Sequence, residues 1–325
     1  MNASLPDAAA IRTVLGLASR APSVHNTQPW RWRVDESSLH LYADPGRQLP
    51  NTDPDGRDLI LSCGAALNHC VVAWASVGWR AKVTRFPDPD DPSHLAAITL
   101  SPCSADSLDI ALAAAIPRRR TDRRHYSSWP VPVGDIALMA GRAARNGVTL
   151  CQVEDIDRLH KIVSQSIWDH LTHDYLAELT EWSGRYESVA GVPARNVPVS
   201  DPRAKIPGRL FAGPALAMPP GTSAAEDNAV VLALGTRTDD RLAQLRAGEA
   251  TSVVLLTATS MGLASCPVTE PLEVAETREA VHADIFGGSH YPQMLLRVGW
   301  AAINADPLPA TPRRDLTEVI EWGGH

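Results

Sequence analysis

Two stretches of this chain share one pattern: "GAALNHCVVAWASVGWRAKVTRFP" at residues 64–87 and "GEATSVVLLTATSMGLASCPVTEP" at residues 248–271. Each begins as a long Ala-rich apolar run, typical of a buried helix, then passes a glycine and enters a strand. A further apolar strand follows each one, at residues 94–102 and 292–300. The repeat predicts two halves of similar topology in one chain, packed like a dimer about a pseudo-two-fold axis.

A second pair of stretches supports the duplication. "VLGLASRAPSVHNTQPWRWRVDE" at residues 14–36 and "LMAGRAARNGVTLCQVED" at residues 138–155 both read as helix, turn and strand. The second copy lacks the residues "PSVHNTQPW". We therefore expect a first half at residues 1–115 and a second half at residues 116–325, each of the α+β class.

Composition limits the class of protein. A chain of 325 residues with 44% hydrophobic and 21% charged residues is typical of a globular protein with a large core. The net charge of −7 argues against general nucleic-acid binding. We find no secretory signal and no apolar run near the ~18 residues that a membrane span needs. The five cysteines form no CxxC pair and favour a reducing, cytoplasmic location.

Positive charge gathers in "RRRTDRR" at residues 118–124, although the chain is acidic. Arginine offers planar, permanently charged donors that suit phosphate, and a second pair lies at Arg313 and Arg314. The alternative is a solvated basic turn. The chain contains neither GxGxxG nor a P-loop motif, so side chains would have to hold any phosphate.

The loop "APSVHNTQPW" at residues 21–30 has the complementary chemistry. Its Ser, Asn, Thr and Gln side chains suit a polyhydroxylated ligand and a ring with carbonyl and N–H edges, whereas the alternative is an Asx or Ser turn. His25 lacks a partner nucleophile, so we assign it no catalytic role.

Two further features complete the candidates. His170, His173 and Asp174 share a helix face, but without a clear third ligand we expect that face to be solvated and predict no metal. Residues 189–224 are rich in Pro and Gly and lack periodicity, which is typical of a lid or a linker.

These motifs resemble the nitroreductase superfamily of FMN-dependent flavoproteins, and more narrowly the dormancy-associated, Acg-like NAD(P)H nitroreductases of actinobacteria. The resemblance is carried by "APSVHNTQPW", "RTDRRHYSSWPVP", "MGLASCPVTEP", "MLLRVGWA" and "TPRRDLTEVI". Ordinary family members place the Arg motif before the Ala-Pro-Ser motif and form intertwined dimers. The order is reversed in this chain. The resemblance therefore implies a nitroreductase-like α+β fold made of two fused, degenerate halves, a pseudo-dimer with one composite FMN site.

The resemblance also implies a set of FMN-binding residues. They are Pro22, Ser23, Asn26 and Gln28 in the loop, Arg120, Thr121 and Arg124 in the Arg segment, Pro267, Val268 and Thr269 in the later turn, and Arg313 or Arg314. The backbone near Thr269 would face flavin N5. Asp122 stands where the family has a phosphate-binding Ser, so we expect Thr121 to supply the hydroxyl while Asp122 pairs with a neighbouring Arg.

The implied activity is two-electron transfer from NAD(P)H through FMN to a nitro or quinone acceptor, with no catalytic side chain. An alternative is an FMN-binding or sequestering protein in which residues 189–224 close over the flavin. A third possibility is a flavin-free duplicated scaffold. The resemblance favours a monomer that mimics a dimer, and it leaves further dimerisation open. FMN, NAD(P)H and a small nitro or quinone acceptor are the partners that it implies.

Overall fold

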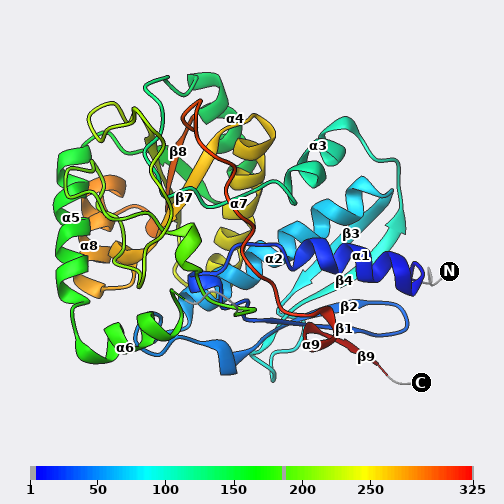
Figure 1. Cartoon of the computed structure of the whole chain (residues 1–325). Coiled ribbons are helices and arrows are strands. Elements are labelled where there is room, and N and C mark those ends of the chain that lie inside the picture. The colour runs from blue at the N-terminus through cyan, green and yellow to red at the C-terminus, as the bar shows by residue number, and fades with distance from the viewer. Residues whose placement is uncertain (1–4, 185–187, 324–325) are drawn as a thin grey trace.

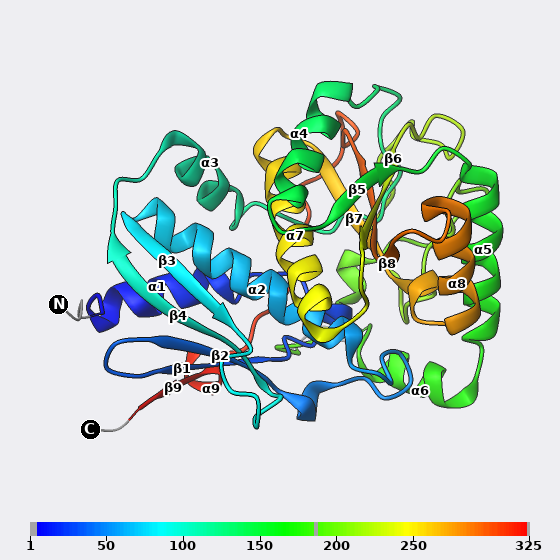
Figure 2. The same cartoon turned by 180° about the vertical axis from the view of Figure 1, so that it is seen from behind.

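The computed structural model describes residues 5–184 and 188–323, which form two sheets separated by a pair of long helices (Figures 1 and 2). The first sheet has the strand order β3-β4-β2-β1-β9, and the second has the order β5-β6-β8-β7. The fold is α+β, as the sequence predicts.

The elements of the first half are α1 (Ala8–Ala18), β1 (Trp30–Val34), β2 (Leu39–Ala43), α2 (Arg57–Ser76), β3 (Trp79–Arg85), β4 (His94–Pro102) and α3 (Ser107–Ala115). Those that follow are α4 (Val133–Ala144), β5 (Thr149–Gln152), α5 (Ile156–Asp169), α6 (His173–Glu181), β6 (Val230–Thr236), α7 (Arg241–Ser260), β7 (Ala264–Val268), α8 (Ala275–Phe286), β8 (Tyr291–Gly299), α9 (Leu316–Val319) and β9 (Ile320–Trp322).

The two halves repeat one topology. The order α1-β1-β2-α2-β3-β4 matches α4-β5-β6-α7-β7-β8 once α5, α6 and α8 are treated as insertions. Strands β3-β4-β2-β1 correspond in order to β7-β8-β6-β5, and every pair within these two sets is antiparallel. The sequence repeat is therefore a repeat of structure, and the predicted duplication is present in the fold.

Helices α2 and α7 cross at equivalent glycines. Each helix has 20 residues, and Gly64 and Gly248 occupy the eighth position of each. A Cβ on Gly64 would clash with the carbonyl oxygen of Leu245, and a Cβ on Gly248 would clash with that of Leu61. Only glycine permits this backbone approach, so equivalent positions of the two helices meet at the crossing.

The same two helices also end alike. Gly78 follows α2 with φ 84° and Gly262 follows α7 with φ 86°. This left-handed conformation favours glycine and turns the chain directly into β3 and β7.

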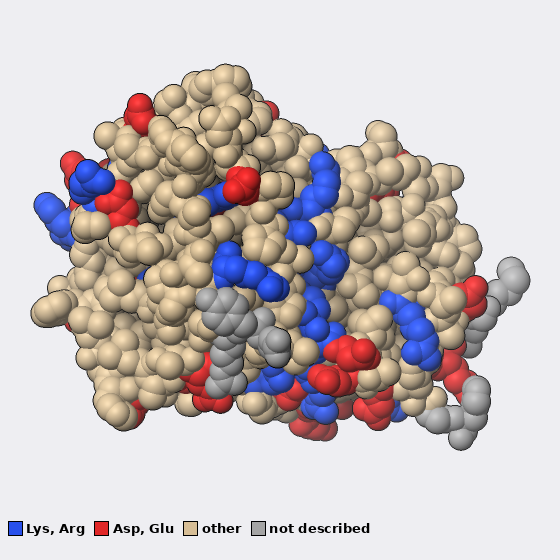
Figure 3. Space-filling model, in the orientation of Figure 1, with Lys and Arg blue, Asp and Glu red and all other residues tan. Residues whose placement is uncertain are grey.

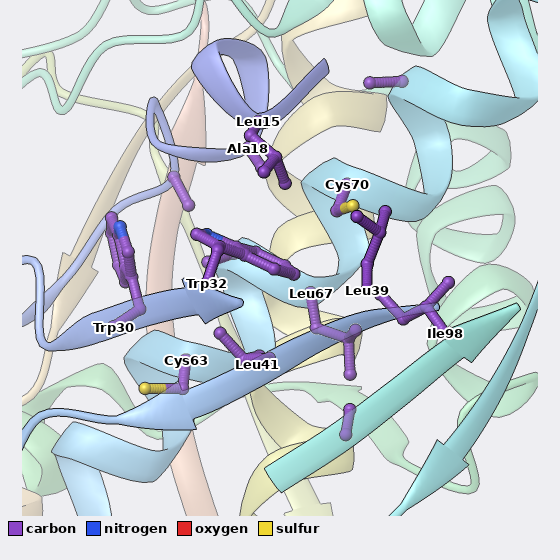
Figure 4. Close-up of a cluster of buried hydrophobic side chains, with 14 of the residues drawn as sticks. Leu15, Ala18, Trp30, Trp32, Leu39, Leu41, Cys63, Leu67, Cys70 and Ile98 are labelled. Atoms are coloured by element: carbon purple, nitrogen blue, oxygen red, sulfur yellow. The ribbon is translucent and has the colours of Figure 1, made fainter. Parts of the chain in front are cut away.

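The core of the first half lies between α2 and its sheet. Trp32, Leu39, Leu67 and Cys70 converge there and are buried (Figure 4). Helix α2 is long and apolar enough to cross a membrane by length and composition, contrary to our sequence expectation. It is mostly buried, as befits the central helix of a packed core.

The C-terminal arm joins the halves a second time. After β8 the chain crosses to the first half (red in Figure 1), where β9 pairs in parallel with β1, Trp32 opposite Ile320. This arm brings the Arg313 region beside the loop that follows α1.

Candidate functional site

Two adjoining cavities lie where the halves meet. The larger has a volume of about 180 Å³ and is lined by the loop after α1, the start of α2, the turn after β7 and residues 197–218. The smaller, of about 60 Å³, is rich in arginine. Residues common to both linings are Pro22, Ser23, His25, Thr121 and Arg123. The cavities thus form one continuous candidate site.

The smaller cavity holds a guanidinium without a partner. Arg119 is buried, and neither its Nε nor its Nη1 has a hydrogen-bond partner among the described residues. Burial, with the nearby charges of Arg120 and Arg20, lowers the pKa of Arg119 to about 10. No described carboxylate lies within ion-pair distance of Arg20, Arg119 or Arg120. Buried cations without counter-charges are costly, so this cluster suits an anion.

The surface over this region is also basic. A band of Lys and Arg side chains runs down the middle of the face seen in Figure 3, along the junction of the halves. Such a band raises the local concentration of anionic ligands at the site.

Arg313 lines the smaller cavity, but its donors are engaged. Its guanidinium donates to the carbonyls of Ser19, Arg20 and Ala21 at 2.8, 3.0 and 3.2 Å and to Oδ1 of Asn26 at 2.9 Å. Burial lowers the pKa of Arg313 to about 9. Arg313 therefore caps the carbonyl end of α1 and orients Asn26.

The Arg-rich segment alternates its side chains. Thr121, Arg123 and His125 line the larger cavity. Between them, Asp122 and Arg124 are buried and form two hydrogen bonds of 2.9 Å with each other. This alternation is typical of extended backbone. From Thr121 to His125 it directs the odd-numbered residues into the larger cavity and commits Arg124 to Asp122.

The loop after α1 is held in an unusual conformation. His25, Asn26 and Gln28 have positive φ of 42°, 56° and 52°. The Asn26 amide donates to the carbonyls of Gly191 and Pro312 at 3.0 and 3.2 Å. Non-glycine residues with positive φ are costly and concentrate at functional sites.

Residues 189–224, called the lid below, lie over the larger cavity, and Ile206, Phe211 and Met218 are among their lining residues. One buried lid residue anchors them. The Arg209 guanidinium donates to Tyr175 Oη at 2.7 Å, to Thr269 Oγ1 at 3.1 Å and to the carboxylate of Glu273.

The lid makes two more polar contacts with the cavity wall. Arg123 stacks over the ring of Phe211, 4.8 Å from its centroid. His125 Nε2 lies 3.1 Å from Oδ2 of Asp201. The lid is therefore packed against the wall of the larger cavity.

Most of the residues implied by the sequence come together here. Those that line the cavities are Pro22, Ser23, Asn26, Arg120, Thr121, Pro267, Val268, Thr269 and Arg313. Gln28, Arg124 and Arg314 do not. Gln28 donates to the carbonyl of Val189 and accepts from the Arg314 N–H, and Arg314 also lies beside Asp44 and Glu318.

Sequence reasoning did not single out Arg119, Arg123 and Arg209, and it set His25 aside. The alternation of extended backbone could have selected Arg123 together with Thr121, whereas Arg119 lies in the turn after α3, where its N–H donates to the Ala115 carbonyl. Arg209 gave no signal, because only the folded lid brings it to Glu273. The histidines considered as metal ligands lie apart: His173 is exposed, whereas His170 is buried and stacks on Tyr175.

Comparisons with known proteins match this chain to one protein family. Residues 116–300 match the model of the Nitroreductase family. A Mycobacterium tuberculosis H37Rv protein with the provisional name NAD(P)H nitroreductase Rv3131 is 68% identical over 99% of this chain and 94% of its own length. Another protein from that strain, with the provisional name NAD(P)H nitroreductase acg, is 37% identical over 95% of each chain.

Among solved structures, a Bacteroides fragilis nitroreductase with bound FMN aligns with 60% of this chain and 90% of its own, at 16% identity and a TM-score of 0.39. The sequence matches, which span nearly the whole chain, carry the assignment. The chain belongs to the nitroreductase family.

Proposed function

We propose that the two cavities bind FMN, with its phosphate in the smaller one and its ring under the lid. The observation that carries this proposal is the buried Arg119 guanidinium, whose Nε and Nη1 lack partners beside Arg20 and Arg120. A buried guanidinium that finds no acceptor for these atoms among the described residues, with two further arginines beside it, suits an anionic group such as a phosphate. The Thr121 hydroxyl lies in the same lining and would complete the phosphate site.

The remaining residues would hold the ribityl chain and the ring. Ser23 lines both cavities and Asn26 the smaller one, whereas Pro267, Val268 and Thr269 line the larger cavity under the lid. Bound FMN would supply two-electron chemistry that the side chains lack. The protein's own contribution would be to orient the ring, present backbone N–H groups near Thr269 and exclude water.

We propose on this basis that the chain is an NAD(P)H-dependent oxidoreductase that reduces nitro or quinone acceptors. The provisional names of its 68% and 37% identical relatives support this class of activity. The five cysteines are free, which supports action in the reducing cytoplasm.

A second function is favoured by the lid. Because Arg209, Phe211 and Asp201 hold it against the cavity wall, a nicotinamide would have to displace it to reach the ring. In that case the protein would bind and sequester FMN with little turnover.

One experiment separates these functions. Purified protein carrying its flavin is mixed anaerobically with NADH or NADPH, and the visible absorbance is followed. A reductase bleaches with at least one of them. Bleaching that occurs only after Arg209→Ala, which removes the lid anchor, supports sequestration. The absence of any bound flavin, together with no FMN binding to the apoprotein, contradicts both functions.

A further inference from the structure

The lid anchor Arg209 contacts a histidine, a side chain whose ordinary pKa of about 6.5 lies near neutral pH. Arg209 Nη1 lies 2.9 Å from Nε2 of His25, in the loop after α1. We propose that this contact is an acid-sensitive latch, which keeps the lid closed near neutral pH and releases it as the pH falls.

The geometry requires a neutral imidazole. A guanidinium can only donate hydrogen bonds, so Nε2 of His25 must accept and its proton must reside on Nδ1. Protonation of Nε2 would turn one N–H toward another and place two positive charges side by side. The closed lid and the protonated form of His25 therefore oppose each other.

The surroundings of His25 offer no compensation. The charged or titratable groups facing it are Arg209 of the lid, Arg123 of the Arg-rich segment and His170 at the end of α5. Phe211 of the lid packs against its edge, with ring centroids 5.7 Å apart. No described carboxylate lies within ion-pair distance of His25. Burial first, then these cations, hold the pKa of His25 well below 6.5.

Lid opening changes this environment, because the lid supplies both Arg209 and Phe211. Once exposed, His25 would regain a pKa near its ordinary value of about 6.5. A histidine whose pKa is lowered in the closed state contributes fully to closure at pH values above its open-state pKa of about 6.5. It loses this contribution as the pH falls below it, so the opening equilibrium rises by up to about tenfold per pH unit.

Two other titratable groups lie near the lid, and one of them, Asp58, acts in the opposite direction. His125 lies between Asp201 of the lid and Asp227, so a lid carboxylate and a wall carboxylate both face its ring. Asp58 of α2 lines the same cavity, and burial raises its pKa to about 6, so its titration favours the closed lid at low pH. A variant of His25 isolates the contribution of the latch from theirs.

The test is hydrogen exchange of the lid amides at residues 197–218 in the full-length protein, as purified, between pH 7.5 and 5. Protection factors, which correct for the intrinsic pH dependence of exchange, report lid opening. The wild-type protein is expected to lose protection below pH 6.5, by up to about tenfold per pH unit. His25→Gln keeps an acceptor but does not titrate, so its lid should stay protected with a much flatter profile.

Three further variants sharpen the result. Arg209→Gln removes the anchor and should leave the lid exposed at every pH. His173→Gln replaces an exposed histidine of α6 and should keep the wild-type profile. His25→Asn suits the positive φ of this position and serves if the Gln variant fails to fold. A wild-type lid without acid-induced opening, or an unchanged slope in the His25 variants, overturns the latch. Either result leaves the FMN proposal standing, because the lid amides report opening whatever the cavity holds.

Discussion

Arg119 is the residue on which the proposed phosphate site depends most. Arg119→Ala removes the two unpartnered donors, so FMN affinity should fall about ten- to a hundredfold, since a charge-assisted hydrogen bond contributes roughly 1.5–3 kcal/mol. Riboflavin lacks the phosphate and should bind the variant and the wild type alike. Titration of the apoprotein with both ligands, followed by flavin fluorescence, measures the difference.

Arg118→Ala provides the matched control, because Arg118 is the exposed neighbour in the same segment. It should leave the affinity for FMN within about twofold of the wild type, since exposed charges contribute little. An equal loss for both variants would mean that the segment acts through its overall charge and not through a defined phosphate contact.

Also at the residue scale, the backbone register of residues 121–125 determines which of their side chains face the larger cavity. The family resemblance pointed to Arg120 and Arg124, whereas the structure turns Arg124 onto Asp122. Its partnership with Asp122 agrees with the expectation that this carboxylate pairs with a neighbouring Arg. The motif located the segment, but it could not say which side chains face inward, because that depends on the strand next to it: the Asp122 N–H donates to the Ser265 carbonyl.

At the scale of elements, the crossing of α2 and α7 sets the distance between the halves. Gly248→Ala would place a methyl group against the Leu61 carbonyl and should destabilise the protein by about 1–3 kcal/mol or more. Denaturant unfolding followed by circular dichroism measures the change.

Gly141→Ala in α4 is the control for helix propensity. A Cβ there has no neighbour within 4 Å, and alanine is favoured over glycine in helices by about 1 kcal/mol. This variant should be as stable as the wild type or more so. If Gly248→Ala were equally stable, the two helices would be free to separate at the crossing, contrary to the close packing described above.

For the whole molecule, the duplication predicts a monomer with one flavin. Only the first half carries the "PSVHNTQPW" loop, and only the second carries the "RRRTDRR" segment, so the parts of one site are present once. Native mass spectrometry of the protein reconstituted with FMN should give a single chain with one FMN. A stoichiometry of two flavins per chain would contradict the composite site. A stable dimer would contradict the hypothesis that the pairing of the two halves within one chain takes the place of a dimer of two chains.

The sequence by itself predicted the repeat of topology, the two central helices and the segments that line the two cavities. These features depend on residues that are close together in the sequence. An Ala-rich apolar run followed by a glycine and a strand pattern predicts a helix and a strand from local periodicity alone. Sequence pattern also marked residues 189–224 as a segment without regular structure, because Pro and Gly interrupt both helices and strands.

Only the tertiary structure decided which side chains meet. Arg209 reaches His25 and Glu273, and Arg313 reaches the end of α1, across separations of 184, 64 and 294 residues along the chain. Such contacts depend on how the halves pack, and a buried charge is stable only where that packing supplies its partners or leaves room for a ligand. Arg119, left without a partner, and His25, turned toward Arg209, acquire their significance from that packing.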